Sequence, residues 1–171
     1  MIHRLALTAV TAAAIVFIGA GAPVVAAYAR EPQARQNWGV NDKPQTLEDG
    51  SRYCALWYGS TRPMLQLQVR SDRRLLILAA PEFTDAQAGE TATLRFPTGF
   101  EAGIPIVNAD GKGALIVRLS AASVNTLLEN LSSVGSFRVT VSERSVSYPV
   151  WQNLAGAIVH LRNCESQLPS S

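Results

Sequence analysis

The chain contains few of the residues that build catalytic or metal sites. It has two histidines and two cysteines among 171 residues. His3 lies in the short positive start of the chain, ahead of the first apolar segment, so His160 is the one histidine in the rest of the chain. A hydrolase triad needs a histidine between nucleophile and carboxylate, and a zinc site needs several nitrogen or sulfur ligands. We therefore predict a protein that is not an enzyme, with no catalytic residue, metal or cofactor.

A strong excess of one charge is also lacking. Fifteen Lys and Arg residues face thirteen Asp and Glu residues, a formal net charge of +2. Proteins that bind nucleic acid usually carry a much larger basic excess. Gly111-Lys112-Gly113 lacks the further glycines of a phosphate-binding loop and fits a hairpin turn instead. We expect no nucleic acid as partner.

The first 29 residues have the anatomy of a secretory signal. Arg4 supplies a positive start, positions 5–29 hold no charged residue, and Ala27-Tyr28-Ala29 offers the small residues that signal peptidase needs. Pro23 interrupts the apolar run. We predict a signal peptide over 1–29 that contacts the membrane only transiently. The alternative is a retained anchor, because the charge-free run is long enough to span a bilayer.

The only two cysteines, Cys54 and Cys164, lie near the two ends of the chain that follows the signal. An exported protein meets an oxidising compartment, where two such thiols pair. Closing so long a loop contributes roughly 4 to 5 kcal/mol in the chain-entropy model. We predict a structural disulfide and a periplasmic or secreted location.

Composition and periodicity divide the remaining chain in two. Segment 30–50 is rich in Pro, Gly, Gln and scattered charges, so we predict that it is flexible. Residues 51–168 are predicted to form a single disulfide-closed β-rich domain. Within it, Leu65, Leu67 and Val69 alternate with polar residues, which is typical of a half-buried strand.

Short connections between such strands favour antiparallel pairing. We predict three hairpins, with strands at 64–70 and 75–79, 104–107 and 114–119, and 137–141 and 145–150. Helical spacing is present twice, after Ser120 and over 152–164. The predicted fold class is mainly β with two helices (α+β), an antiparallel β-sandwich-like or curved sheet with a late helix and a C-terminal helix.

The order of motifs resembles the invasion-associated locus B family of small exported bacterial proteins. The resemblance covers roughly residues 90 to 164 and is carried by Leu94-Arg95-Phe96-Pro97-Thr98-Gly99, Gly103-Ile104-Pro105-Ile106 and the closing Leu154-Ala155-Gly156-Ala157-Ile158. That family has additional cysteines around the middle hairpin, which this chain lacks. Small periplasmic accessory proteins of type VI secretion have a similar ending. Either resemblance implies a periplasmic β-sandwich-like protein without established catalysis.

These observations predict an exported, non-enzymatic periplasmic accessory or binding protein whose partner is a protein of the cell envelope. The aromatic residues Trp57, Tyr148 and Trp151 are the candidates for its binding surface. The alternative function is an inhibitor or immunity-type protein against a secreted enzyme, acting through loops 81–90 and 97–103. A hydrolase is a third interpretation.

Overall fold

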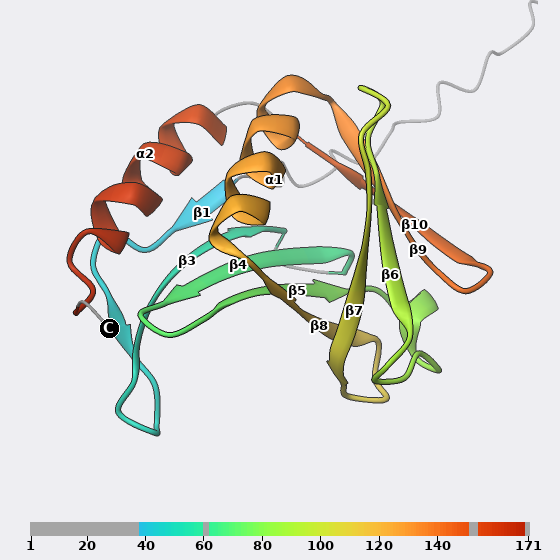
Figure 1. Cartoon of the computed structure of the whole chain (residues 1–171), viewed down its shortest axis with the longest axis horizontal. Helices are drawn as coiled ribbons and strands as arrows, with labels where there is room; N and C mark the ends of the chain where they lie inside the picture. The colour runs from blue at the N-terminus through green and yellow to red at the C-terminus, as the bar shows by residue number, and fades with distance from the viewer. Residues whose placement is uncertain (1–37, 60–61, 151–153, 170–171) are drawn as a thin grey trace, which may run out of the picture. The chain divides into compact units, whose positions relative to one another are not determined.

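The computed structural model describes residues 38–59, 62–150 and 154–169. These ranges contain strands, one short 3-10 helix (η1) and two α-helices (Figure 1). The strands are β1 (Trp38–Val40), β2 (Gln45–Thr46), β3 (Arg52–Tyr58), β4 (Met64–Arg70), β5 (Arg74–Ala79), β6 (Thr91–Arg95), β7 (Glu101–Ala109), β8 (Ala114–Leu119), β9 (Ser136–Val141) and β10 (Arg144–Pro149). The helices are η1 (Pro81–Phe83), α1 (Ala121–Ser133) and α2 (Leu154–Glu165).

All strand pairs are antiparallel, and they follow the order β1-β3-β4-β5-β8-β7-β6-β9-β10, with β2 also paired to β3. Strand β7 joins the two halves of this order. Its residues 101–105 pair with β6, whereas Ile106, Asn108 and Ala109 pair with β8, and an irregular register lies between Ile106 and Asn108. An extra residue in one strand bends a sheet. The β6 and β7 ribbons accordingly run across the direction of β3, β4 and β5 (Figure 1).

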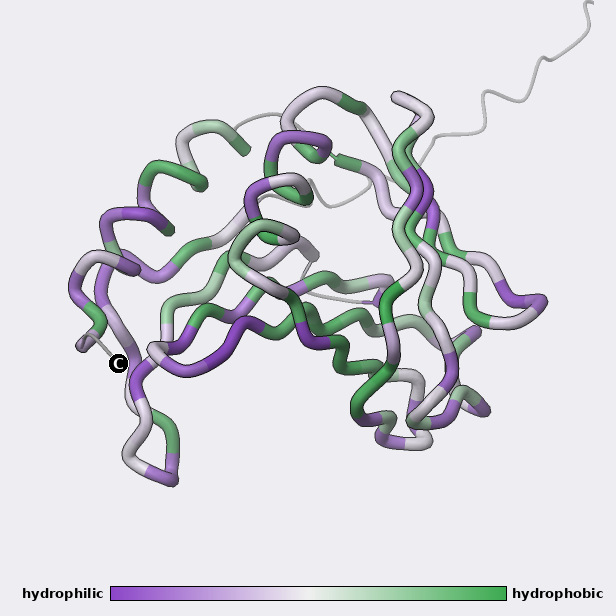
Figure 2. The backbone as a smooth tube through the Cα atoms, in the orientation of Figure 1, coloured by the Kyte–Doolittle hydropathy of each residue, from purple (hydrophilic) through white to green (hydrophobic). Residues whose placement is uncertain are grey.

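The inner faces of both halves and the two helices share one hydrophobic core. Helix α1 buries Val124, Leu127, Leu128 and Leu131, one stripe at helical spacing. The Ser120 hydroxyl accepts a hydrogen bond from the Ser123 amide and caps this helix. Hydrophobic residues follow β5 and β8, while hydrophilic ones gather at turns such as the tip of the β9–β10 hairpin (Figure 2).

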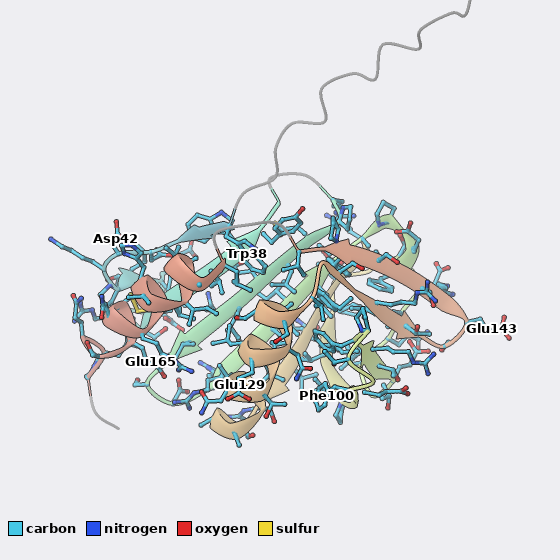
Figure 3. All side chains as sticks on the ribbon, turned by 90° about the horizontal axis from the view of Figure 1, so that it is seen from above. Trp38, Asp42, Phe100, Glu129, Glu143 and Glu165 are labelled. Atoms are coloured by element: carbon cyan, nitrogen blue, oxygen red, sulfur yellow. A yellow bond between two sulfur atoms is a disulfide. The ribbon has the colours of Figure 1, made fainter. Side chains whose placement is uncertain are left out.

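A disulfide between Cys54 of β3 and Cys164 of α2 fastens the last helix to the sheet. The two Cα atoms lie 5.9 Å apart, and 110 positions separate the cysteines in sequence. Both side chains are 0 % exposed. The bond is drawn in yellow beneath α2 in Figure 3. The predicted pairing is therefore present.

The predicted fold class is confirmed, because the chain forms an antiparallel sheet with one late and one C-terminal helix. The three predicted hairpins also form. The predicted domain boundary at residue 51 differs from the structure, since β1 and β2 precede it and pair with β3. Trp38 explains part of the difference, because its ring packs against Tyr58 at a centroid distance of 5.2 Å.

The described residues cluster as one compact unit. The predicted signal segment, 1–29, lies outside the described residues. Within the described ranges no helix is both long and apolar enough to cross a membrane.

Candidate functional site

Apart from Pro149 at the end of β10, the outer face of β6, β9 and β10 carries hydroxyl-bearing and guanidinium side chains. In each strand the buried residues alternate with exposed or half-buried polar ones, because successive side chains point to opposite faces of a sheet. The polar residues on this face are Thr91, Thr93, Arg95, Ser136, Arg138, Thr140, Ser145 and Ser147. The face is therefore suited to hydrogen bonding rather than to apolar contact.

Register places a row of charged and polar residues across four neighbouring strands. Glu101 of β7 lies opposite Arg95 of β6, Arg95 lies opposite Arg138 of β9, and Arg138 lies opposite Ser147 of β10. Residues directly opposite one another in antiparallel strands have Cβ atoms about 5 Å apart. Two arginine residues are thus neighbours at the centre of the row.

The ion pairing along this row is unequal. Arg95 Nε donates a hydrogen bond to Glu101 Oε2 at 2.8 Å. This bond lowers the pKa of the Glu101 carboxyl and raises the pKa of Arg95. No carboxylate in the described ranges forms an ion pair with Arg138. The row therefore keeps one positive charge without a partner, next to a serine.

A shallow cleft lies on this row. Its volume is about 220 Å³, and its lining consists of Arg95, Phe96, Pro97, Ser136, Phe137, Arg138 and Ser147. We call these residues the arginine cleft. Two arginines and two serines line it together with aromatic and proline residues, a set of side chains that can bind carboxylate, phosphate or sulfate oxygens.

Stacked aromatic rings hold the three strands beneath the arginine cleft. Phe96 stacks on Phe137 with ring centroids 5.1 Å apart, and Phe137 stacks on Tyr148 at 5.2 Å. Phe96 directly follows β6, Phe137 belongs to β9 and Tyr148 belongs to β10. All three rings are buried. One ring from each strand fixes the backbone that presents the outer residues, so the cleft is preorganised.

The predicted binding-surface residues do not form this site. Tyr148 is 0 % exposed and faces the core, so its assignment to an exposed surface is wrong. Side chains alternate between the two faces of β10, and Val146 and Tyr148 point to the core while Ser145 and Ser147 are exposed. Trp57 is half-buried on β3, where its indole covers the backbone of Gly39. Trp151 lies outside the described residues.

The two loops of the inhibitor alternative are held against the fold. In segment 81–90, Phe83 and Ala86 are buried, and Asp85 pairs with Arg144 at 3.3 Å. At the other loop, β7 already begins at Glu101, and Thr98 Oγ1 donates a hydrogen bond to Asn130 Oδ1 of α1 at 2.9 Å. No observation in these loops favours the alternative.

His160, the residue of the hydrolase interpretation, lies on the exposed side of α2. Its Nδ1 atom is 3.0 Å from Asp42 Oδ1, and more than half of both side chains is exposed. Among the residues with described positions, no three His, Cys, Asp or Glu side chains are grouped closely enough to hold a metal ion.

Sequence reasoning missed the arginine cleft. The alternation in 91–95 and 136–141 identifies Arg95 and Arg138 as outward-facing, but it does not show that β6 pairs with β9. Comparison with known proteins adds no assignment, because no family model, no curated protein and no solved structure matches this chain.

Proposed function

We propose that this protein is an exported binding protein of the bacterial cell envelope that has no catalytic activity and recognises a protein partner through the arginine cleft. The observation that carries the proposal is the row Glu101–Arg95–Arg138–Ser147, in which Arg138 has no carboxylate partner among the described residues. Like charges directly opposite one another destabilise a sheet. A sheet that keeps such a pair at a rigid cleft is therefore suited to an anionic ligand.

Export is supported by two independent features. The first 29 residues have the charge and side-chain pattern of a cleavable signal. The disulfide between Cys54 and Cys164 is typical of proteins that mature in an oxidising compartment. The proposal includes no catalysis because His160 pairs with Asp42 on an exposed helix surface, and not with a nucleophilic side chain.

Site-specific photo-crosslinking in the native cells tests the binding surface. A photo-reactive residue replaces Ser147 in the arginine cleft, and in a matched protein it replaces Arg118, which is exposed on β8. We expect a discrete crosslinked partner from position 147 that is lost when Arg138→Glu is added. The same adduct from position 118, or an adduct that survives Arg138→Glu, would refute the proposed surface.

Cell fractionation tests the location separately. We expect to find the protein in the periplasmic extract. Its intact mass should match a chain whose first residue is Arg30. A protein recovered in the membrane fraction with residues 1–29 attached would support the retained anchor instead.

A further inference from the structure

Strand β10 is the last strand in the sheet order, and its outer edge runs beside the arginine cleft. Ser142 and Glu143 form the turn before it, and Glu143 marks the tip of the hairpin in Figure 3. The Val150 amide donates a hydrogen bond to the Gly135 carbonyl at 2.8 Å, which extends the same register beyond the strand. Hydrogen-bonded and non-bonded pairs alternate along an antiparallel ladder.

This alternation settles which backbone groups of β10 are used. Arg144, Val146 and Tyr148 exchange hydrogen bonds with β9, because they lie at even spacing from Val150. Ser145 and Ser147 therefore direct their N–H and C=O groups away from β9. No backbone hydrogen bond from another described residue reaches these groups.

Helix η1 and the segment that follows it also contact β10. The Arg144–Asp85 ion pair attaches segment 81–90 to the side where Val146 and Tyr148 are buried. Pro149 has no amide hydrogen and closes the edge at its far end. The open edge is thus a short window centred on Ser145 and Ser147.

We infer that the partner binds by adding an extended acidic segment to β10, with a carboxylate opposite Ser147 that pairs with Arg138. This inference rests on the proposed function and names the occupant of its site. An added strand supplies backbone donors and acceptors to the open edge, and its alternate side chains share the outer face with Ser147. A glutamate or aspartate opposite Ser147 would extend the row Glu101–Arg95–Arg138–Ser147 by a fifth residue.

The geometry of the row permits this pairing. Strands lie about 4.8 Å apart, so an added residue stands about 10 Å from Arg138 with only Ser147 between them. The serine side chain is small, and the long arginine and the carboxylate can meet above it. Charge also selects the occupant, because Arg95 is already paired with Glu101, whereas Arg138 has no carboxylate partner among the residues that the structure describes.

Fluorescence anisotropy with three synthetic peptides tests the inference on the purified, unreduced protein. Each probe is a labelled nine-residue peptide of alternating valine and threonine whose central outward residue is glutamate, glutamine or lysine. We expect the glutamate peptide to bind about three- to five-fold more tightly than the glutamine peptide. The lysine peptide should bind weakest. Arg138→Gln should remove these differences, and Arg118→Gln should retain them.

A second variant separates strand addition from simple charge attraction. Ser147→Pro removes the outward amide hydrogen and leaves the bonds to β9 in place, so all three peptides should lose most of their binding. Ser147→Ala loses the cleft hydroxyl but keeps the amide, so it should bind the peptides much more tightly than Ser147→Pro, and circular dichroism checks that both variants fold.

Binding that is unchanged in Ser147→Pro, or equal for the glutamate and lysine peptides, would overturn the inference. If the crosslink from position 147 still forms in that case, the proposed function stands and only the mode of binding is wrong. If inorganic phosphate binds at Arg138 and the peptides do not, the site is an anion site without strand addition.

Discussion

The Ala80 amide donates a hydrogen bond to the Gly113 carbonyl at 2.9 Å, and the Ala80 carbonyl occupies the space that a side chain on Gly113 would need. Gly113 also has a φ of +93°, which glycine adopts without strain. This contact connects the β7–β8 turn to the end of β5. The turn therefore depends on glycine at one position for two separate reasons.

Two alanine substitutions in this turn should destabilise the protein by different amounts. Gly111 has a φ of +65° and open space around it, so Gly111→Ala should destabilise the protein by only about 1 kcal/mol. Gly113→Ala adds the clash with Ala80 and should cost about 3 kcal/mol or more. Urea unfolding measures both. Equal losses would show that the Ala80 contact does not constrain the turn.

The disulfide should contribute a large share of the stability. It closes a loop that spans 110 positions, and such a loop contributes about 4 to 5 kcal/mol in the chain-entropy model. The Cys54→Ala/Cys164→Ala double variant should lose about that much in urea unfolding. In the wild type, thiol labelling after denaturation without reductant should find no free cysteine. Two labelled thiols would contradict the pairing.

The Tyr148 hydroxyl is buried and has no hydrogen-bond partner among the described residues. Removing such a group leaves no other polar atom unsatisfied, so Tyr148→Phe should leave stability at pH 7 unchanged or raise it by up to about 1 kcal/mol. A loss greater than 1 kcal/mol would reveal a bond that this hydroxyl makes.

The same residue predicts a response to alkali. Burial raises the pKa of Tyr148 above its ordinary value of 10.0. Above pH 10 the unfolded chain releases this proton while the folded protein retains it, so stability should fall as the pH rises further. Tyr148→Phe should lose less stability than the wild type over this range. Parallel curves would contradict the assignment of the effect to Tyr148.

The row of the arginine cleft predicts a response to acid. Because Arg95 lowers the pKa of Glu101, their contact stabilises the fold above pH 4.5 and is lost as the pH falls through the lowered pKa. In Arg95→Gln, carboxyl NMR titration should show the pKa of Glu101 rising. Glu90 is the internal control, since its pKa is lowered by the Gln87 amide and the Ser142 hydroxyl, which this substitution leaves in place. If the pKa of Glu101 stays unchanged in Arg95→Gln, the ion pair does not form in solution.

Much of the fold could be predicted because its signals are local. Alternation at Leu65, Leu67 and Val69 predicted β4, and three hairpins followed from short connections between strands. The two cysteines had only each other to pair with. The three residues of β1, Trp38–Val40, carry too short a pattern to establish a strand from the sequence alone, and the strand forms through its pairing with β3.

The candidate site could not be predicted in the same way. Arg95 and Arg138 meet because β6 pairs with β9, and this register depends on packing between distant segments. The burial of Tyr148 could have been predicted from the local sequence. Residues 145–148 alternate between serine and a larger apolar or aromatic residue, and this alternation places the tyrosine on the inner face. Strand phase is therefore a better guide to exposure here than aromatic character alone.

Hydrogen exchange at the Ser147 amide, followed by NMR with and without the glutamate peptide, tests the binding of a strand at the arginine cleft most directly. In the free protein this amide should exchange quickly while the neighbouring Val146 and Tyr148 amides are protected, and saturating peptide should slow it to a comparable rate. An amide that is already protected in the free protein, or that stays unprotected when the peptide is bound, would contradict the account.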